Sequence, residues 1–217
     1  MDPLLWFRWI GWALLLALGV WLFFFLFPAR LIRKIKPFPM PAGLARLLDN
    51  PLRRLIAPPE KALERMGLEP GMRTLEVGPG PGFWTLAAAG RVGPQGRVCA
   101  VEISPRLAGL VARKARRRGL SWVHVVVADA RALPLAEGAF DHAFFVAVLG
   151  EVPDPVRALQ EVRRVLRPGG RVAITEYLLD PDYSLPATML RRAEQAGLRL
   201  RRRRNSLLGY TLDLERD

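Results

Sequence analysis

The stretch Glu76-Val77-Gly78-Pro79-Gly80-Pro81-Gly82 follows a short apolar run and precedes a helix-like segment. Glycines in such a loop let the main chain turn tightly and let a ligand approach bare backbone. The spacing departs from a dinucleotide-binding fingerprint, because the third glycine comes one residue early and position 83 is Phe83. The loop also lacks the Lys-Ser/Thr pair of a phosphate-binding P-loop. The pattern therefore predicts a strand–loop–helix unit that opens a ligand-binding α/β domain.

Strand-like and helix-like segments alternate outward from this loop. Strands are expected at 73–77, 97–102, 123–128, 140–148 and 171–177, helices at 83–89, 105–118, 155–166 and 184–196, and a terminal hairpin at 198–203 and 210–215. Continuous apolar strands joined by helices are typical of a parallel sheet covered on both faces, and right-handed crossovers make that sheet doubly wound. Ligands bind such sheets at the carboxyl ends of the strands.

Acidic residues end three consecutive strands of this pattern. Glu76 precedes the first glycine, Glu102 ends the next strand, and Asp129 ends the one after it. A carboxylate at Glu102 can accept both ribose hydroxyls of a nucleoside. Asp129 can accept an adenine amino group, with the backbone N–H of Ala130 near the ring. Glu76 alternatively serves only to stabilise the following helix electrostatically. Three acids in one crevice suit a cationic nucleoside better than a pyrophosphate.

Successive segments of the chain resemble the motifs of class I S-adenosylmethionine-dependent methyltransferases. These segments are Leu75–Gly82, Ala100–Ser104, Ala128–Ala130, Leu133–Leu135 and Arg164–Gly170, within a likeness that spans roughly residues 45–217. The chain is most similar to the methyltransferase type 11 group, which includes quinone-biosynthesis C-methyltransferases. The resemblance implies a seven-stranded, mostly parallel, Rossmann-like sheet whose last strand is antiparallel. It also implies that Gly78, Gly80 and Gly82 abut the cofactor, that Glu102 holds its ribose and that Asp129 holds its adenine.

The acceptor side of the predicted site is less well marked. Related proteins often carry a histidine before the acid that follows the fourth strand, and here that position is Gly150, followed by Glu151. A carbon acceptor needs a base, and Glu151 and Glu176 are the candidate catalytic residues; the alternative, which the pattern favours slightly, is that each is a solvated loop acid. We expect the acceptor to be bound by N-terminal helices and by the Asp180–Leu185 loop. No metal is expected, since the cofactor itself activates the methyl group.

The N-terminal segment carries a long apolar run. From Trp9 to Phe27 there are 19 residues without a charge, which as a helix would reach about 28 Å, close to the thickness of a bilayer's hydrocarbon core. The basic residues after it are Arg30, Arg33, Lys34 and Lys36. The sequence therefore predicts a single-pass transmembrane anchor with a basic flank at 1–36, a Pro-rich linker at 37–44, and a methyltransferase domain at 45–217 on the cytoplasmic side.

Composition and charge narrow the function. The net charge of +13 favours an anionic membrane leaflet as a partner, or else reflects only a composition rich in arginine. The sequence has no zinc-ligand spacing and no RNA-binding motif that would indicate nucleic-acid binding. The sequence predicts methyl transfer from S-adenosylmethionine to a membrane-associated or amphipathic small molecule, a quinone precursor or a phospholipid amine. The alternatives are a non-catalytic membrane-tethered cofactor-binding module, a NAD-dependent oxidoreductase, and nucleic-acid methylation that uses the arginines at 201–204.

Overall fold

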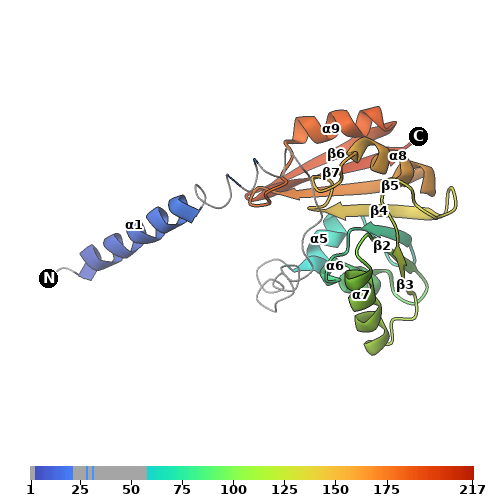
Figure 1. The fold of residues 1–217 in the computed structure, drawn as a ribbon, viewed down its shortest axis with the longest axis horizontal. Coiled ribbons are helices and arrows are strands. Elements are labelled where there is room, and N and C mark those ends of the chain that lie inside the picture. Colours follow the sequence, from blue (N-terminus) through green and yellow to red (C-terminus); the bar gives the residue numbers. More distant parts are fainter. Residues whose placement is uncertain (1–2, 22–27, 29–30, 32–57) are drawn as a thin grey trace.

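The computed structural model describes residues 3–21, 28, 31 and 58–217. Its globular part is built on a seven-stranded sheet with the strand order β3-β2-β1-β4-β5-β7-β6 (Figure 1). The strands are β1 Arg73–Val77, β2 Arg97–Glu102, β3 Val123–Val127, β4 Phe140–Val146, β5 Leu166–Tyr177, β6 Leu198–Ser206 and β7 Gly209–Arg216. Neighbouring strands pair in parallel, except that β7 is antiparallel to both β5 and β6. The predicted doubly wound, mostly parallel sheet with a terminal hairpin is confirmed.

Helices connect the strands and begin at residues suited to a first turn. They are α5 Pro59–Arg65, α6 Phe83–Val92, α7 Pro105–Arg117, α8 Pro155–Val165 and α9 Pro186–Gln195. All but α6 begin with proline, whose fixed φ and missing N–H fit the first helical position. Ser104 Oγ accepts the Leu107 N–H (3.4 Å) at the start of α7, and Asp154 Oδ1 accepts the Arg157 N–H (3.0 Å) at the start of α8. These caps fix where the helices leave the sheet.

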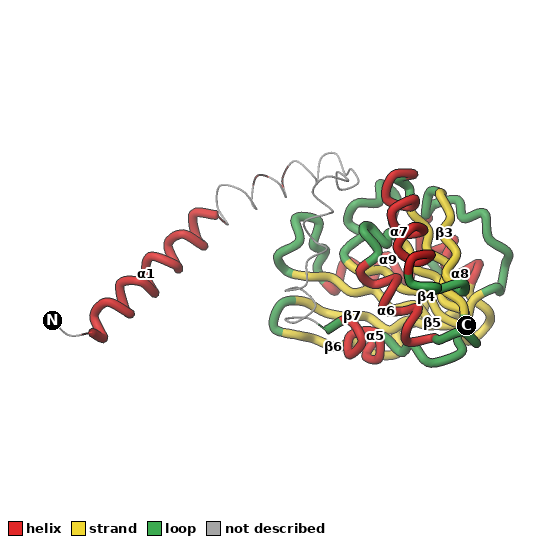
Figure 2. Tube along the Cα trace, turned by 90° about the horizontal axis from the view of Figure 1, so that it is seen from below, coloured by secondary structure: helices red, strands yellow, loops and turns green. Residues whose placement is uncertain are grey.

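Apolar side chains from both faces of the sheet form two cores. Successive residues of a strand point to opposite faces, so Leu75 of β1 joins one core with Leu159 of α8 and Met189 of α9. Phe144 of β4 joins the other core with Trp84 of α6. Helix α7 packs along β2 and β3. In Figure 2 the yellow strands accordingly lie between red helices. Helices therefore cover both faces of the sheet.

The N-terminal helix corrects one prediction. Helix α1 spans Pro3–Trp21. Among the residues that the structure describes, no helix combines the length and the hydropathy needed to cross a membrane. The predicted single-pass membrane localisation is therefore wrong. Residues 22–27 of the apolar run and the predicted linker at 37–44 lie outside the described residues.

Strand β5 begins earlier than predicted. Leu166 follows α8 with extended backbone (φ −71°, ψ 142°) and pairs with Phe140, whereas regular pairing resumes only between His142 and Arg171. Residues 167–170 therefore form an irregularity inside the strand, at the Pro-Gly-Gly segment that the sequence pattern marks as a loop. Local turn chemistry does not reveal this pairing, because it depends on the neighbouring strand.

Candidate active site

A cavity of about 420 Å³ lies at the carboxyl ends of the central strands. Its wall includes Gly78 and Gly80 of the loop after β1, Glu102 at the end of β2, Asp129 after β3 and Glu151 after β4. This is the place at which open α/β sheets bind ligands, and the volume falls within the range of small-molecule sites. The topology thus brings together side chains that are far apart in the sequence.

The glycines of the loop have distinct roles. A Cβ at Gly78 (φ +74°) would lie 2.6 Å from both methyl groups of Val148, so only glycine lets β1 end against β4 in this way. At Gly80 (φ +53°) a Cβ would meet no atom within 4 Å, which leaves bare main chain open toward the cavity. Gly82 (φ +88°) precedes α6, and its Cβ would contact Val111 of α7. Gly78 and Gly80 line the cavity, and Gly82 does not belong to its lining.

Glu102 is held in place by the backbone on both sides. Its Oε2 accepts the Gly80 N–H (3.1 Å), and its Oε1 accepts the Ser104 N–H (3.0 Å). The residue is 6% exposed, and burial raises the pKa of its carboxyl while hydrogen bonds from the backbone of Ser104, Gly80 and Ile103 lower it. A carboxylate has about four acceptor positions, so Glu102 can still accept a donor from the cavity. A ribose hydroxyl is a donor of that kind.

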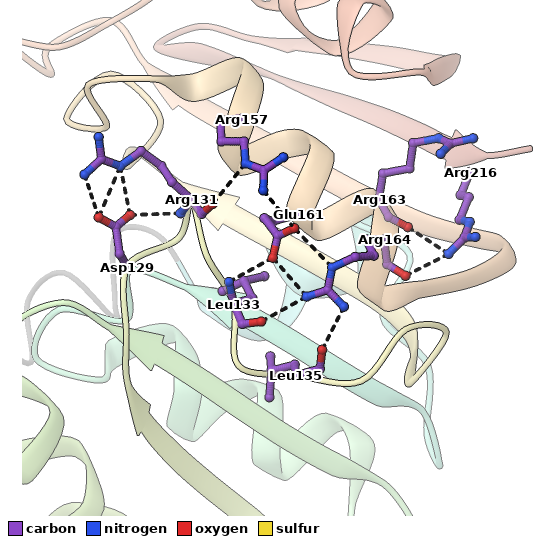
Figure 3. Close-up of polar contacts among 9 residues, drawn as sticks. All are labelled: Asp129, Arg131, Leu133, Leu135, Arg157, Glu161, Arg163, Arg164 and Arg216. Carbon is purple, nitrogen blue, oxygen red and sulfur yellow. Dashed lines mark hydrogen bonds and ion pairs between the residues drawn. The ribbon is translucent and has the colours of Figure 1, made fainter.

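Asp129 is paired with an arginine that the sequence analysis did not single out. Arg131 donates its backbone N–H (2.9 Å) and Nε (3.0 Å) to Asp129 Oδ1, and its Nη2 (2.7 Å) to Oδ2 (Figure 3). These contacts lower the pKa of Asp129. Ala130 and Arg131 line the cavity beside Asp129. The predicted adenine end of the site therefore carries both a carboxylate and a guanidinium.

Two predicted acids lie outside the cavity lining. Glu76 is 2% exposed, and burial raises the pKa of its carboxyl to about 8, with a further contribution from the nearby Glu102. Glu176 is 1% exposed, and burial likewise raises its pKa to about 8, with Asp180 adding to the shift. Glu176 pairs in register with Tyr210, whose hydroxyl donates to the backbone of the loop before α9. Both acids end central strands as predicted, but their side chains are enclosed by protein.

The acceptor side is formed by the segments after β4 and β5. Glu151 lines the cavity, together with Tyr177 at the end of β5 and with Asp180 and Pro181 from the loop that follows. A Cβ at Gly150 would overlap the carbonyl oxygen of Asp182 in that loop. No side chain fits at position 150, so the two segments pack backbone to backbone where related proteins often carry a histidine. Of the Asp180–Leu185 loop, which was expected to bind the acceptor, the first two residues line the cavity.

The residues of the cavity fit a cationic nucleoside cofactor. Open main chain at Gly80, the bonding capacity left on Glu102, and the Asp129–Arg131 pair occupy one side. The rest of the cavity wall includes residues that belong to no recognised sequence motif, such as Trp84 and Val148. Lys114 is a further example, since its Nζ donates to the Pro81 carbonyl (2.7 Å) from the next helix and steadies the glycine loop.

Part of the chain is similar to known methyltransferases. Residues 75–174 match a family model described as a methyltransferase domain. A demethylmenaquinone methyltransferase of Anoxybacillus flavithermus is 33% identical over 124 residues, which cover 57% of this chain and 52% of that protein. An uncharacterized 37.1 kDa protein in transposon TN4556 of Streptomyces fradiae is 42% identical over 125 residues, covering 56% and 33%. The chain thus spans about half the length of the curated demethylmenaquinone methyltransferases it matches.

Solved structures share the fold. A SAM-dependent methyltransferase from Aquifex aeolicus superposes with a TM-score of 0.78 at 24% identity, over 82% of this chain and 100% of that one. The [4+2]-cyclase SpnF superposes with a TM-score of 0.61 at 29% identity, over 67% of this chain and 57% of that one. Because a protein described as a cyclase has this fold as well, the fold alone does not specify a reaction.

Proposed function

We propose that this chain, whose residues 75–174 match a methyltransferase domain, transfers a methyl group from S-adenosylmethionine to a small-molecule acceptor of the quinone-precursor type. The observation that carries the proposal is the cavity wall formed by Gly80, Glu102 and Asp129 at the carboxyl ends of adjacent strands. When bound, S-adenosylmethionine supplies a methyl group that a positively charged sulfur already activates. The protein therefore needs mainly to bind and align, which can lower a barrier by roughly 7–11 kcal/mol.

The residues proposed to bind the nucleoside are already held in position by hydrogen bonds to the backbone. Glu102 is proposed to accept the ribose hydroxyls, since the N–H groups of Gly80 and Ser104 already orient its carboxylate. Asp129 is proposed to accept the adenine amino group, with the backbone of Ala130 beside the ring. Groups held in this way need little reorganisation on binding. The buried Glu76 is proposed to support the loop from behind and not to contact the ligand.

The acceptor side is assigned to the segment after β4. Of the two candidate bases, Glu151 lines the cavity and Glu176 does not, so we propose that Glu151 accepts the proton released when a carbon atom is methylated. Tyr177 and Leu179 also line the cavity, and their apolar surface suits an aromatic ring more than a small polar amine. The printed names of the curated relatives specify demethylmenaquinone, and this supports a quinol ring as the first acceptor to test.

A methyl-transfer assay tests the proposal. The full chain is incubated with methyl-tritiated S-adenosylmethionine and either a demethylmenaquinol, a plain phenol or a primary amine, and the extracted products are counted. We expect label in the quinol product, and about 100-fold less with Glu151→Gln, which removes the proton acceptor. Glu64→Gln on the exposed face of α5 is the matched control and should leave the rate unchanged.

The outcomes separate the acceptor from the cofactor. Transfer to the amine or phenol but not to the quinol would contradict the acceptor class and leave the methyltransferase activity standing. Transfer to no acceptor, together with absence of cofactor binding in a titration, would contradict the proposed function as a whole. Unchanged transfer by Glu151→Gln would remove the assigned base.

A further inference from the structure

The connection between β3 and β4 forms the adenine side of the cavity with little regular structure of its own. It runs from residue 128 to residue 139, and its first part supplies Asp129, Ala130 and Arg131 to the cavity wall. Inside the connection, the Ala132 N–H donates to Asp129 O (3.0 Å), and backbone bonds to other elements come at its two ends, from Ala128 N–H to Glu102 O (3.2 Å) and from Gly138 N–H to Arg164 O (3.1 Å). A segment of this kind keeps considerable conformational freedom unless other parts of the chain hold its polar groups. Its position therefore depends on what binds it from outside.

Helix α8 binds this connection through its backbone. Arg164 donates from Nη2 to the Leu133 carbonyl and from Nη1 to the Leu135 carbonyl, both at 2.9 Å. In return, the Leu133 N–H donates to Glu161 Oε2 at 2.9 Å. Figure 3 shows these side chains pointing from the helix to the connection. One arginine and one carboxylate thus satisfy three backbone groups of a segment that lacks regular hydrogen bonding.

The two side chains also hold each other. Arg164 Nη2 lies 2.9 Å from Glu161 Oε2, and its Nε donates to Oε1 at 3.1 Å, a two-point contact that fixes both groups. Glu161 is 7% exposed, and Arg164 lowers the pKa of its carboxyl, so the pair stays charged at neutral pH. Arg157, one turn earlier, donates from Nε to the Arg131 carbonyl (3.3 Å). The chain of contacts therefore runs from α8 to the residue that pairs with Asp129.

We infer that Glu161 and Arg164 are positioning residues for the nucleoside side of the site. Neither belongs to the cavity lining, so they act through the 129–135 segment, which they keep in the conformation that presents Asp129 and Ala130. The inference rests on the proposed function, because it assigns these residues an effect on cofactor affinity. If the segment samples other conformations, the apparent affinity falls by the fraction of time it spends in the competent one.

The test compares two neighbouring arginines of α8. Arg164→Gln removes the two bonds to the connection, whereas Arg163→Gln removes a bond of the same kind to the Gly197 carbonyl (2.9 Å), away from the cavity. Each full-length variant is titrated with S-adenosylhomocysteine in a calorimeter, below its unfolding temperature. We expect the Kd to rise at least about tenfold for Arg164→Gln, by less than about twofold for Arg163→Gln, and by an intermediate factor for Arg164→Lys.

Hydrogen exchange provides a readout that general destabilisation does not reproduce. In Arg164→Gln, amide exchange in peptides covering residues 129–135 should accelerate, while peptides covering 76–82 stay protected. Equal losses of affinity in Arg164→Gln and Arg163→Gln, or unchanged exchange at 129–135, would overturn the inference. If Arg164→Gln does not fold, Arg164→Lys and Glu161→Gln are compared with Arg163→Gln in the same two measurements. Wild-type protein that does not bind the ligand would contradict the proposed function, while exchange would still test the contact between α8 and the segment.

Discussion

Replacing Glu102 by glutamine exchanges one carboxylate oxygen for an amide NH2 group and separates the binding role of this residue from its structural role. The carboxylate accepts the Gly80 and Ser104 N–H groups from behind, which leaves acceptor positions on both oxygens for a ribose. Glutamine has one acceptor oxygen, and its amide N–H₂ would face one of the two backbone donors. One bond between a hydroxyl and a charged acceptor is lost, at about 1.5–3 kcal/mol, so we expect the affinity for S-adenosylhomocysteine to fall about 10- to 150-fold.

Stability should respond differently from affinity. Because burial raises the pKa of Glu102, the ionised carboxylate is less favourable in the folded chain than in the unfolded one. A neutral amide removes that penalty while losing one backbone bond, so we expect the free energy of unfolding to change by less than about 1 kcal/mol. Calorimetric titration and urea denaturation of Glu102→Gln, with Glu64→Gln as the control, measure the two quantities. Unchanged affinity with normal folding would refute the ribose assignment.

Other substitutions test the loop and the buried groups. Burial raises the pKa of Glu76 to about 8, so the free energy of unfolding of the wild-type protein should fall as the pH rises from about 4.5 to 8. In urea denaturation, Glu76→Gln should show a smaller fall over this range. The same pH dependence in the variant and the wild type would contradict this. Gly78→Ala combines positive φ with a 2.6 Å approach to Val148 and should cost about 2–4 kcal/mol of unfolding free energy, against about 1 kcal/mol for Gly80→Ala; equal costs would contradict the packing argument. Burial raises the pKa of Cys99 to about 11, so a thiol reagent should label it only as the chain unfolds; immediate labelling would contradict its burial.

The fold was largely predictable because its strands are marked locally. The bounds of β1 and β2 agree with the sequence pattern, since each apolar run is closed by a glycine-rich or proline-containing loop. The start of β5 was not predictable, because Leu166 becomes a strand residue only by pairing with Phe140. The membrane prediction was wrong, since none of the helices that the structure describes has the length and hydropathy to cross a membrane.

The site was predictable at the level of strand ends but not of side-chain direction. Glu102 and Glu76 both belong to strand ends, yet only Glu102 reaches the cavity wall, since neighbouring strands and helices enclose Glu76. The ion pair between Arg131 and Asp129 was not predicted, although a basic residue two positions after an acid is a signal that could have indicated it. The contacts of Lys114 and Arg164 with backbone carbonyls bridge segments that are distant in the sequence, and no local pattern encodes them.

Equilibrium dialysis of the full chain against methyl-labelled S-adenosylmethionine tests the central claim most directly. The account predicts one bound molecule per chain, displaced by S-adenosylhomocysteine, not displaced by NADH, and weakened by Glu102→Gln. Folded wild-type protein that retains no label, or that releases it equally to NADH, would contradict a nucleoside site formed by Gly80, Glu102 and Asp129.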